Sequence, residues 1–247
     1  MKASQSQSIE ALKSSQIFKG SRLRHRQKAA QGEYLSSGLT GLDELLRGGF
    51  PRGTLVELVG DPCSGRSALA LRVLARAAAQ DELTAYVDAF DALDVQAALD
   101  CGVDLDKLLW VRCASAAASR SLARAFKAAD IVARGGGFGA LVLDLDPPAA
   151  ALGESGPTAP YKSFFRLHQA VRRTPMVMLV LSRRRLAGSA ASLALSLRRA
   201  ETDWGLATSP GEPPHPRVLR GARDEIEVMK GRSYGSATLH RGLCDAS

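Results

Sequence analysis

The chain has 247 residues, of which 45% are hydrophobic and 23% charged, and its formal net charge is +8. This apolar content excludes an intrinsically disordered chain, and the length fits one compact domain with or without a tail. The longest uninterrupted apolar run, 176–181, is far shorter than the roughly 20 residues of a transmembrane helix. The first 30 residues carry no secretory signal pattern, so we expect a cytoplasmic protein without membrane contact.

The first segment, 1–34, is a basic arm with seven Lys and Arg residues against two acidic ones. Four apolar side chains in it are spaced to form one face of a short helix. Since short isolated helices are marginal in water, that face would dock on a partner; the alternative is a solvated tail with a frayed helix. The four residues are Ile9, Leu12, Ile17 and Phe18.

From residue 54 onward, short apolar strands alternate with Ala-rich helical stretches. We expect strands at 54–59, 84–88, 108–112, 139–144 and 176–181, and helices beginning near Ser67, Ala92, Ala117 and Tyr161. This alternation predicts an α/β fold with a mainly parallel sheet flanked by helices. We assign residues 35–209 to this core.

Two Pro- and Gly-rich breaks interrupt the pattern. The first, 147–160, predicts a surface loop near the carboxyl end of the preceding strand, where ligand-facing loops of such sheets lie. The second, 210–216, precedes a last segment in which the alternation at 225–230 predicts one or two antiparallel edge strands. We therefore treat residues 210–247 as a small antiparallel extension. The four cysteines (Cys63, Cys101, Cys113, Cys244) lack C-x-x-C spacing, so we expect free thiols and no structural zinc.

The sharpest motif is G-D-P-C-S-G-R-S at 60–67, which fits the phosphate loop G-x-x-x-x-G-K-[ST] except that Arg66 replaces lysine. It lies between a predicted strand and a predicted helix, as that motif requires. Backbone amides at a helix N-terminus favour phosphate, and the final serine is placed to contact Mg²⁺. We expect a P-loop fold with ATP and Mg²⁺ as candidate cofactors. The candidate nucleotide-binding residues are Gly60, Ser64, Gly65, Arg66, Ser67 and Asp144.

Asp144 ends an apolar strand, as a Walker-B carboxylate does when it supports Mg²⁺ together with Ser67. The alternative is an ordinary acid at a strand end. Arg66 carries a planar, delocalised charge where the motif has a compact ammonium, so we expect hydrolysis to suffer more than binding. The chain holds 25 Arg and only eight Lys, so compositional drift is a second origin for Arg66. Such drift would persist only if the catalytic task of the lysine no longer mattered.

Several segments resemble the bacterial RecA recombinase family. The stretches 36–43 and 48–53 are similar to that family's lead-in to its phosphate loop. The stretches 86–94 and 101–109 are similar to the region that carries its catalytic glutamate and the helix beyond. The resemblance, which covers about 36–145, implies a RecA-like core and a nucleoid-associated role in DNA repair.

The departures from the RecA pattern concern catalysis. Phe90 stands where the resemblance places the glutamate that deprotonates the attacking water, and phenylalanine accepts no proton. Together with Arg66, this implies a degenerate ATPase, and we assign no catalytic residue. The alternative is a slow DNA-dependent ATPase in which Asp91, expected to point elsewhere, or Asp146 serves as the base.

The two DNA-binding loops of the RecA family are also altered. The first is replaced by 147–160, and the second is shortened to 182–189 without the family's nucleotide-sensing glutamine, so strand exchange is not expected. Lys230 and Arg232 resemble the paired basic residues that reach a neighbour's nucleotide in recombinase filaments, which makes them candidates for a subunit interface.

This pattern of losses resembles the ImuA family, the recombinase-related members of bacterial mutagenesis cassettes. That resemblance implies an adaptor in damage-induced (SOS) translesion synthesis. The implied partners are the recombinase RecA, an inactive Y-family polymerase homologue, or both. In this setting the apolar face of the arm would dock on a recombinase subunit in place of that protein's own N-terminal helix.

A run of eight arginines between 166 and 199 contains no acid and predicts a surface that follows a phosphate backbone. Only Phe164 and Phe165 accompany it nearby, so base-specific recognition is not indicated. A solvated basic face is the alternative. The run comprises Arg166, Arg172, Arg173, Arg183, Arg184, Arg185, Arg198 and Arg199, of which the last five are our candidates for DNA or partner binding.

Overall fold

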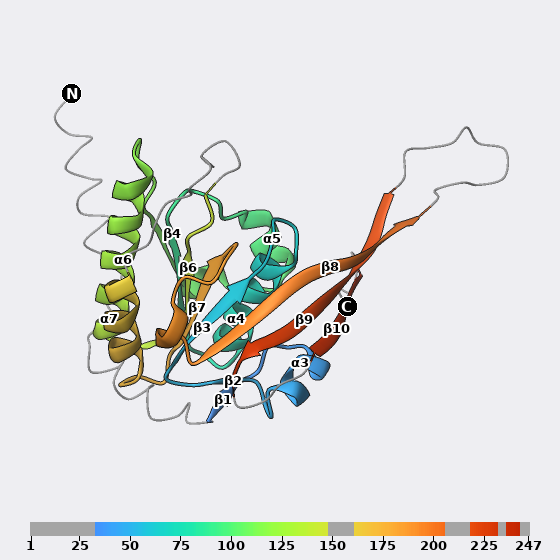
Figure 1. The fold of residues 1–247 in the computed structure, drawn as a ribbon, viewed down its shortest axis with the longest axis horizontal. Coiled ribbons are helices and arrows are strands. Elements are labelled where there is room, and N and C mark those ends of the chain that lie inside the picture. Colours follow the sequence, from blue (N-terminus) through green and yellow to red (C-terminus); the bar gives the residue numbers. More distant parts are fainter. Residues whose placement is uncertain (1–32, 148–160, 206–217, 232–235, 243–247) are drawn as a thin grey trace, which may run out of the picture.

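The computed structural model describes residues 33–147, 161–205, 218–231 and 236–242. These residues form a two-stranded sheet, β1–β2, and an eight-stranded sheet in the order β10-β9-β8-β3-β7-β6-β4-β5 (Figure 1). The strands are β1 (Tyr34–Leu35), β2 (Phe50–Pro51), β3 (Thr54–Val59), β4 (Leu83–Asp88), β5 (Leu108–Arg112), β6 (Phe138–Asp144), β7 (Val177–Ser182), β8 (Leu193–Gly205), β9 (Val218–Lys230) and β10 (Ser236–Gly242). The α-helices are α3 (Thr40–Leu45), α4 (Arg66–Ala79), α5 (Val95–Asp100), α6 (Ala118–Gly135) and α7 (Tyr161–Val171), and the 3₁₀ helices are η1 (Leu105–Lys107) and η3 (Gly188–Ala190).

The α/β fold expected from the sequence is confirmed. Every neighbouring pair from β8 to β5 runs parallel, and β9 and β10 are added antiparallel at one edge. The expected strands of the core each coincide with an observed strand to within one residue. The helix expected near Ala92 begins later, at Val95, because the Asp94 side chain caps it by accepting the amides of Gln96 and Ala97.

The sheet separates two apolar cores. On one face, Val56 and Leu58 of β3 pack in the cluster that contains α4. On the other face, Leu55 packs with α6 and α7, which lie side by side in Figure 1. The rings of Phe126 and Phe164 join these two helices edge to face, with their centroids 5.0 Å apart. Because β3 is covered on both faces, the loop at its carboxyl end is anchored on a rigid element.

The strand β8 was not predicted. It pairs parallel with β3 over Leu193–Ser196 and antiparallel with β9 along most of its length. The expectation of antiparallel strands around 225–230 is confirmed, and these strands are longer than expected. Figure 1 shows β8 and β9 running together beyond the rest of the sheet as a two-stranded ribbon.

Some predicted features lie outside the described residues. These are the basic arm up to residue 32, with its apolar face, the loop 148–160, the break at 210–216, Arg232 and Cys244. Within the described ranges no helix is long and apolar enough to cross a membrane, and no group of His, Cys, Asp and Glu is suited to hold a metal ion.

Candidate nucleotide-binding site

The loop between β3 and α4 depends on its glycines. Gly65 has φ +92°, in the left-handed region that favours glycine, and it leads directly into α4 at Arg66. A Cβ on Gly60 would lie 2.2 Å from the carbonyl oxygen of Leu197 in β8. The tight turn therefore brings the loop amides to the N-terminus of a 14-residue helix, a geometry that favours an anion.

The arginine of this loop has an internal partner. Arg66 is only 5% exposed, and its Nη2 donates to Oδ2 of Asp146 at 2.7 Å. The same carboxylate accepts a hydrogen bond from Nε of Arg183 at 2.8 Å through Oδ1. Within the described residues, Nε and Nη1 of Arg66 and Oγ of Ser64 are buried without a hydrogen-bond partner. The loop thus keeps unused buried donors while one guanidinium nitrogen is held by a carboxylate.

Asp144 lies at the end of β6 and is 4% exposed. Its Oδ2 accepts the Tyr86 hydroxyl at 2.7 Å, and its Oδ1 accepts the amide of Asp146 at 3.0 Å. Burial raises the pKa of Asp144 to about 6, against the opposing effect of the Tyr86 hydrogen bond. Burial and the neighbouring carboxylate also raise the pKa of Tyr86 well above its ordinary value. The Tyr86 contact was not foreseen, although a tyrosine in an apolar strand signals a buried hydroxyl that needs a partner.

The residues after β4 form a tight turn organised by Asp88. Its carboxylate accepts the amides of Phe90, Ala92 and Leu93 at 3.0–3.2 Å, and Oδ2 also accepts Nε1 of Trp110 at 3.3 Å. Phe90 packs against the core that contains α6 and α7. The turn is therefore built by one buried carboxylate and leaves an apolar side chain at position 90.

The two acids considered as replacement bases differ in their surroundings. Asp91 forms two hydrogen bonds with exposed Arg112, which hold its pKa below the ordinary value, and Arg112 also lies over the Trp110 ring. Asp91 is thus engaged in a surface pair, in line with the expectation that it points elsewhere. Asp146 lies directly at Arg66, so it is the acid that the fold brings to the phosphate loop.

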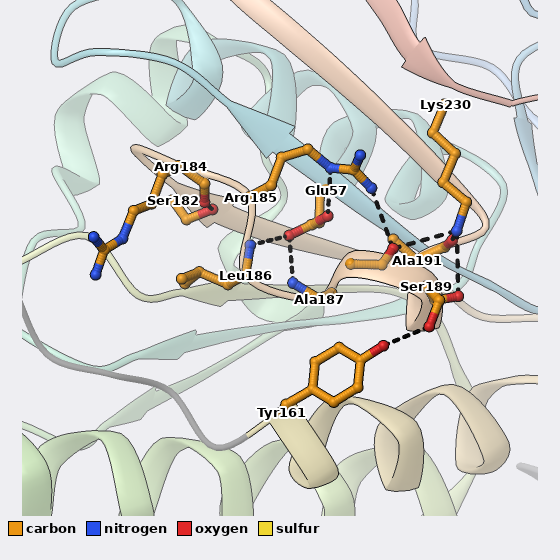
Figure 2. Close-up of polar contacts among 11 residues, drawn as sticks. Glu57, Tyr161, Ser182, Arg184, Arg185, Leu186, Ala187, Ser189, Ala191 and Lys230 are labelled. Atoms are coloured by element: carbon orange, nitrogen blue, oxygen red, sulfur yellow. Dashed lines mark hydrogen bonds and ion pairs between the residues drawn. The ribbon is translucent and has the colours of Figure 1, made fainter.

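The loop after β7 is fixed by Glu57, which lies in the middle of β3 and is fully buried. One carboxylate oxygen accepts the amides of Leu186 and Ala187, each at 2.6 Å (Figure 2). The other oxygen lies 3.5 Å from Nε of Arg185. Sequence reasoning missed Glu57, although a lone acid inside an apolar strand is the signal of a buried polar contact.

Lys230, at the end of β9, holds the same loop from another side. Its ammonium donates to the carbonyls of Gly188 and Ser189 at 3.2 Å and of Ala191 at 2.5 Å, as Figure 2 shows. The hydroxyls of Tyr161 and Ser189 are 2.5 Å apart. The residue proposed for a subunit interface thus makes its described contacts within its own chain.

The run of arginines is largely paired with acids from other segments, which the sequence distance concealed. The ion pairs are Arg166–Asp130, Arg183–Asp146, Arg185–Glu57, Arg198–Glu225 and Arg199–Asp224. Arg172, Arg173 and Arg184 are exposed and form no ion pair with another described residue. The basic surface is therefore narrower than the sequence suggests.

Comparison with known proteins agrees with this fold. Residues 6–156 match the RecA N-terminal domain family. Protein RecA of Rhizobium leguminosarum bv. viciae is 36% identical over 146 residues, which are 57% of this chain and 40% of that protein. Protein RecA of Corynebacterium efficiens is 38% identical over 129 residues, which are 50% and 32% of the respective chains. Protein RecA of Parvibaculum lavamentivorans is 36% identical over 157 residues, or 62% and 41%. The chain spans about two-fifths or less of the length of these relatives, and since the matched domain covers more than half of it, the chain belongs to the RecA family.

Proposed function

We propose that this chain is an accessory member of the RecA family that acts in the DNA-damage response without efficient ATP hydrolysis. The observation that carries the proposal is the state of the phosphate-loop arginine, since Arg66 is buried and paired with Asp146. Phe90 adds to this, because a side chain without a proton acceptor stands where the family resemblance expects the base. Both features disfavour turnover more than binding.

Nucleotide binding without turnover fits the remaining geometry. The loop amides, the α4 N-terminus and the buried unpaired donors of Ser64 and Arg66 are suited to phosphate. Ser67 and Asp144 are the residues that would support Mg²⁺. A bound ATP would then act as a structural or switching ligand, and Gly60 and Gly65 give the backbone the approach it needs.

For nucleic acid, we propose sequence-independent contact with a phosphate backbone through the loop after β7. Arg184 is exposed and forms no ion pair with another described residue, and Arg183 and Arg185 flank it. Arg198 and Arg199, also candidates from the sequence, are paired with acids of β9 and are therefore weaker donors to DNA. Backbone contacts of this kind supply affinity that falls with salt.

The resemblance to the ImuA family supports a finer proposal. The chain would be a cytoplasmic, nucleoid-associated adaptor in translesion synthesis that contacts the recombinase RecA, an inactive Y-family polymerase homologue, or both. Deleting residues 1–30 is then expected to abolish binding to purified RecA, measured by interferometry. Unchanged binding would contradict docking through the arm.

A second candidate function is a slow DNA-dependent ATPase. It is favoured by Asp146, because this carboxylate lies within hydrogen-bond distance of the phosphate-loop arginine and is the acid placed to act as a base. Asp91 is a poorer candidate, since its described hydrogen bonds are to Arg112 at the surface and not to the phosphate loop.

ATP turnover with and without single-stranded DNA, measured beside equilibrium ATP binding, decides between the two. We expect the wild type to bind ATP with no turnover above background. If Arg66 and Phe90 are the only positions at which the catalytic residues were lost, the Arg66→Lys/Phe90→Glu double variant should hydrolyse ATP. DNA-stimulated turnover by the wild type that disappears in Asp146→Asn would instead establish the enzyme.

A further inference from the structure

One carboxylate joins the two proposed anion-binding elements. Asp146 follows β6, and its two oxygens are hydrogen-bonded to Arg66 of the phosphate loop at 2.7 Å and to Arg183 of the loop after β7 at 2.8 Å. Arg183 also donates to the carbonyl of Pro147. The side chains of Arg66, Asp146 and Arg183 are 5%, 21% and 27% exposed, so water screens this cluster only in part.

The backbone around the cluster holds its members in place. The amide of Asp146 donates to Asp144, and the amide of Leu145 donates to the carbonyl of Leu181 at the end of β7. Glu57 and Lys230 contact different residues of the segment that follows Arg183, as Figure 2 shows: Glu57 accepts the amides of Leu186 and Ala187, and Lys230 donates to the carbonyl of Ala191. When a ligand binds, we therefore expect Arg66, Asp146 and Arg183 to exchange hydrogen-bond partners while the backbone of the loop after β7 stays in place.

The charges determine the direction of the exchange. The guanidinium groups of Arg66 and Arg183 share the carboxylate of Asp146. Each of them therefore weakens the ion pair that Asp146 forms with the other. A phosphate bound at the loop after β3 draws Arg66 away, and Asp146 then holds Arg183 alone and more tightly. A backbone phosphate that draws Arg183 away has the reverse effect on Arg66.

We propose that Asp146 is a shared counter-ion that makes nucleotide binding at the phosphate loop and single-stranded nucleic acid binding at the loop after β7 antagonistic. The inference rests on the proposed function, which supplies both ligands. By thermodynamic reciprocity each ligand weakens the other by the same factor.

The linkage is measured with the full chain by fluorescence anisotropy of a labelled single-stranded oligonucleotide, with and without saturating ATP and Mg²⁺ at fixed ionic strength. ATP is expected to weaken oligonucleotide binding by about fivefold or more, the lower end of usual coupling strengths. In Asp146→Asn, which removes the shared charge, the factor is expected to approach one. Asp104→Asn is the matched control, since Asp104 pairs with Lys107 beside η1 and its loss should leave the factor unchanged.

A second measurement needs no nucleic acid. Arg183→Ala leaves Asp146 to Arg66 alone, so ATP affinity is expected to fall severalfold. Arg184→Ala is the control, because it removes an equal charge at the neighbouring residue. Arg184 forms no ion pair with another described residue, so this variant measures only the effect of the lost positive charge on ATP affinity. Equal effects of the two variants on ATP affinity would overturn the shared counter-ion.

The outcomes separate the inference from the proposed function. A failure of the wild type to bind oligonucleotide, or ATP, at low salt would overturn that part of the proposed function and the linkage with it. If both ligands bind but ATP leaves the oligonucleotide affinity unchanged or strengthens it, only the linkage is overturned. Antagonism that persists at full strength in Asp146→Asn would also overturn it, because direct repulsion between the ligands would then suffice.

Discussion

The phosphate loop and the loop after β7 lie at the carboxyl ends of neighbouring strands, yet they are shaped by different means. The phosphate loop follows mainly from local sequence, because its turn needs Gly65 in the left-handed region and its end is the start of a helix. The loop after β7 is shaped by distant side chains, since Glu57 and Lys230 supply the partners of its amides and carbonyls. A motif therefore predicts the first backbone, whereas the second depends on the assembled sheet.

The largest expected effect follows from removing the buried carboxylate of the second loop. Glu57→Ala leaves the amides of Leu186 and Ala187 without an acceptor, and each buried unsatisfied group costs about 1–3 kcal/mol. We expect the free energy of unfolding, measured with urea, to fall by about 4 kcal/mol for the pair. Glu57→Gln keeps one oxygen as an acceptor and should lose much less. Equal losses in the two variants would show that the amides do not depend on this oxygen.

Asp144, at the end of β6, is expected to make the free energy of unfolding depend on pH. Its pKa of about 6 in the folded protein lies above the ordinary 3.8, so the folded state binds the proton more tightly than the unfolded state does. Stability from this group is therefore greatest below pH 4 and is lost as the pH rises through 6. The difference amounts to about 3 kcal/mol on the scale of 1.36 kcal/mol per pKa unit.

Urea titrations of the wild type and of Asp144→Asn at several pH values between 4 and 7 measure this loss. The other carboxylates cancel in the comparison, so the wild type should lose stability relative to the variant as the pH rises. Parallel curves would mean that Asp144 titrates near its ordinary value.

The same contrast between local and distant determinants limits what the sequence could predict. The strands around Val56, Val87 and Val142 were predicted because each is a short apolar run bounded by turn residues. The beginning of β8 carries a similar signal in the alternation of Leu193, Leu195 and Leu197. Its continuation is polar and is stabilised as a strand by pairing with β9, so no local pattern marks it.

The candidate site was predictable in its backbone and not in its contacts. The motif indicates where Arg66 lies, and the end of an apolar strand indicates where Asp144 lies. Their partners Asp146 and Tyr86 are fixed by the order of β4, β6 and β7 in the sheet. The arginine run likewise reads as unpaired in sequence because its acids come from other strands and helices. Charge patterns along a chain therefore overstate the basic surface that remains after folding.

A smaller effect is expected at the point where the phosphate loop touches β8. Gly60→Ala would place a methyl group 2.2 Å from the Leu197 carbonyl, and relieving such a clash costs about 2 kcal/mol, within the 1–3 kcal/mol typical of overpacking. ATP binding should weaken with it, since the loop must shift. Gly41→Ala in α3 is the control, because among the described residues no atom beyond its chain neighbours and its own helix backbone lies within 4 Å of the added group. If Gly60→Ala changed neither the free energy of unfolding nor the affinity for ATP, the phosphate loop would tolerate displacement from β8.

The smallest effect concerns the ammonium that closes the loop after β7. Lys230→Met keeps much of the side chain's length but removes the donor to the carbonyls of Gly188, Ser189 and Ala191. Because Lys230 is partly exposed and water replaces the lost donor in part, we expect a loss of about 1 kcal/mol in stability, the usual net value of a hydrogen bond.

The local consequence should be larger than the global one: brief trypsin digestion is expected to cleave after Arg184 severalfold faster, while cleavage elsewhere is unchanged. Lys162→Met on the exposed face of α7 controls for the lost charge. Faster cleavage at every site would instead mean that Lys230 stabilises the whole fold and not this loop in particular. Lys230 would then not support the distinction between the phosphate loop, which is shaped by local sequence, and the loop after β7, which is shaped by distant side chains.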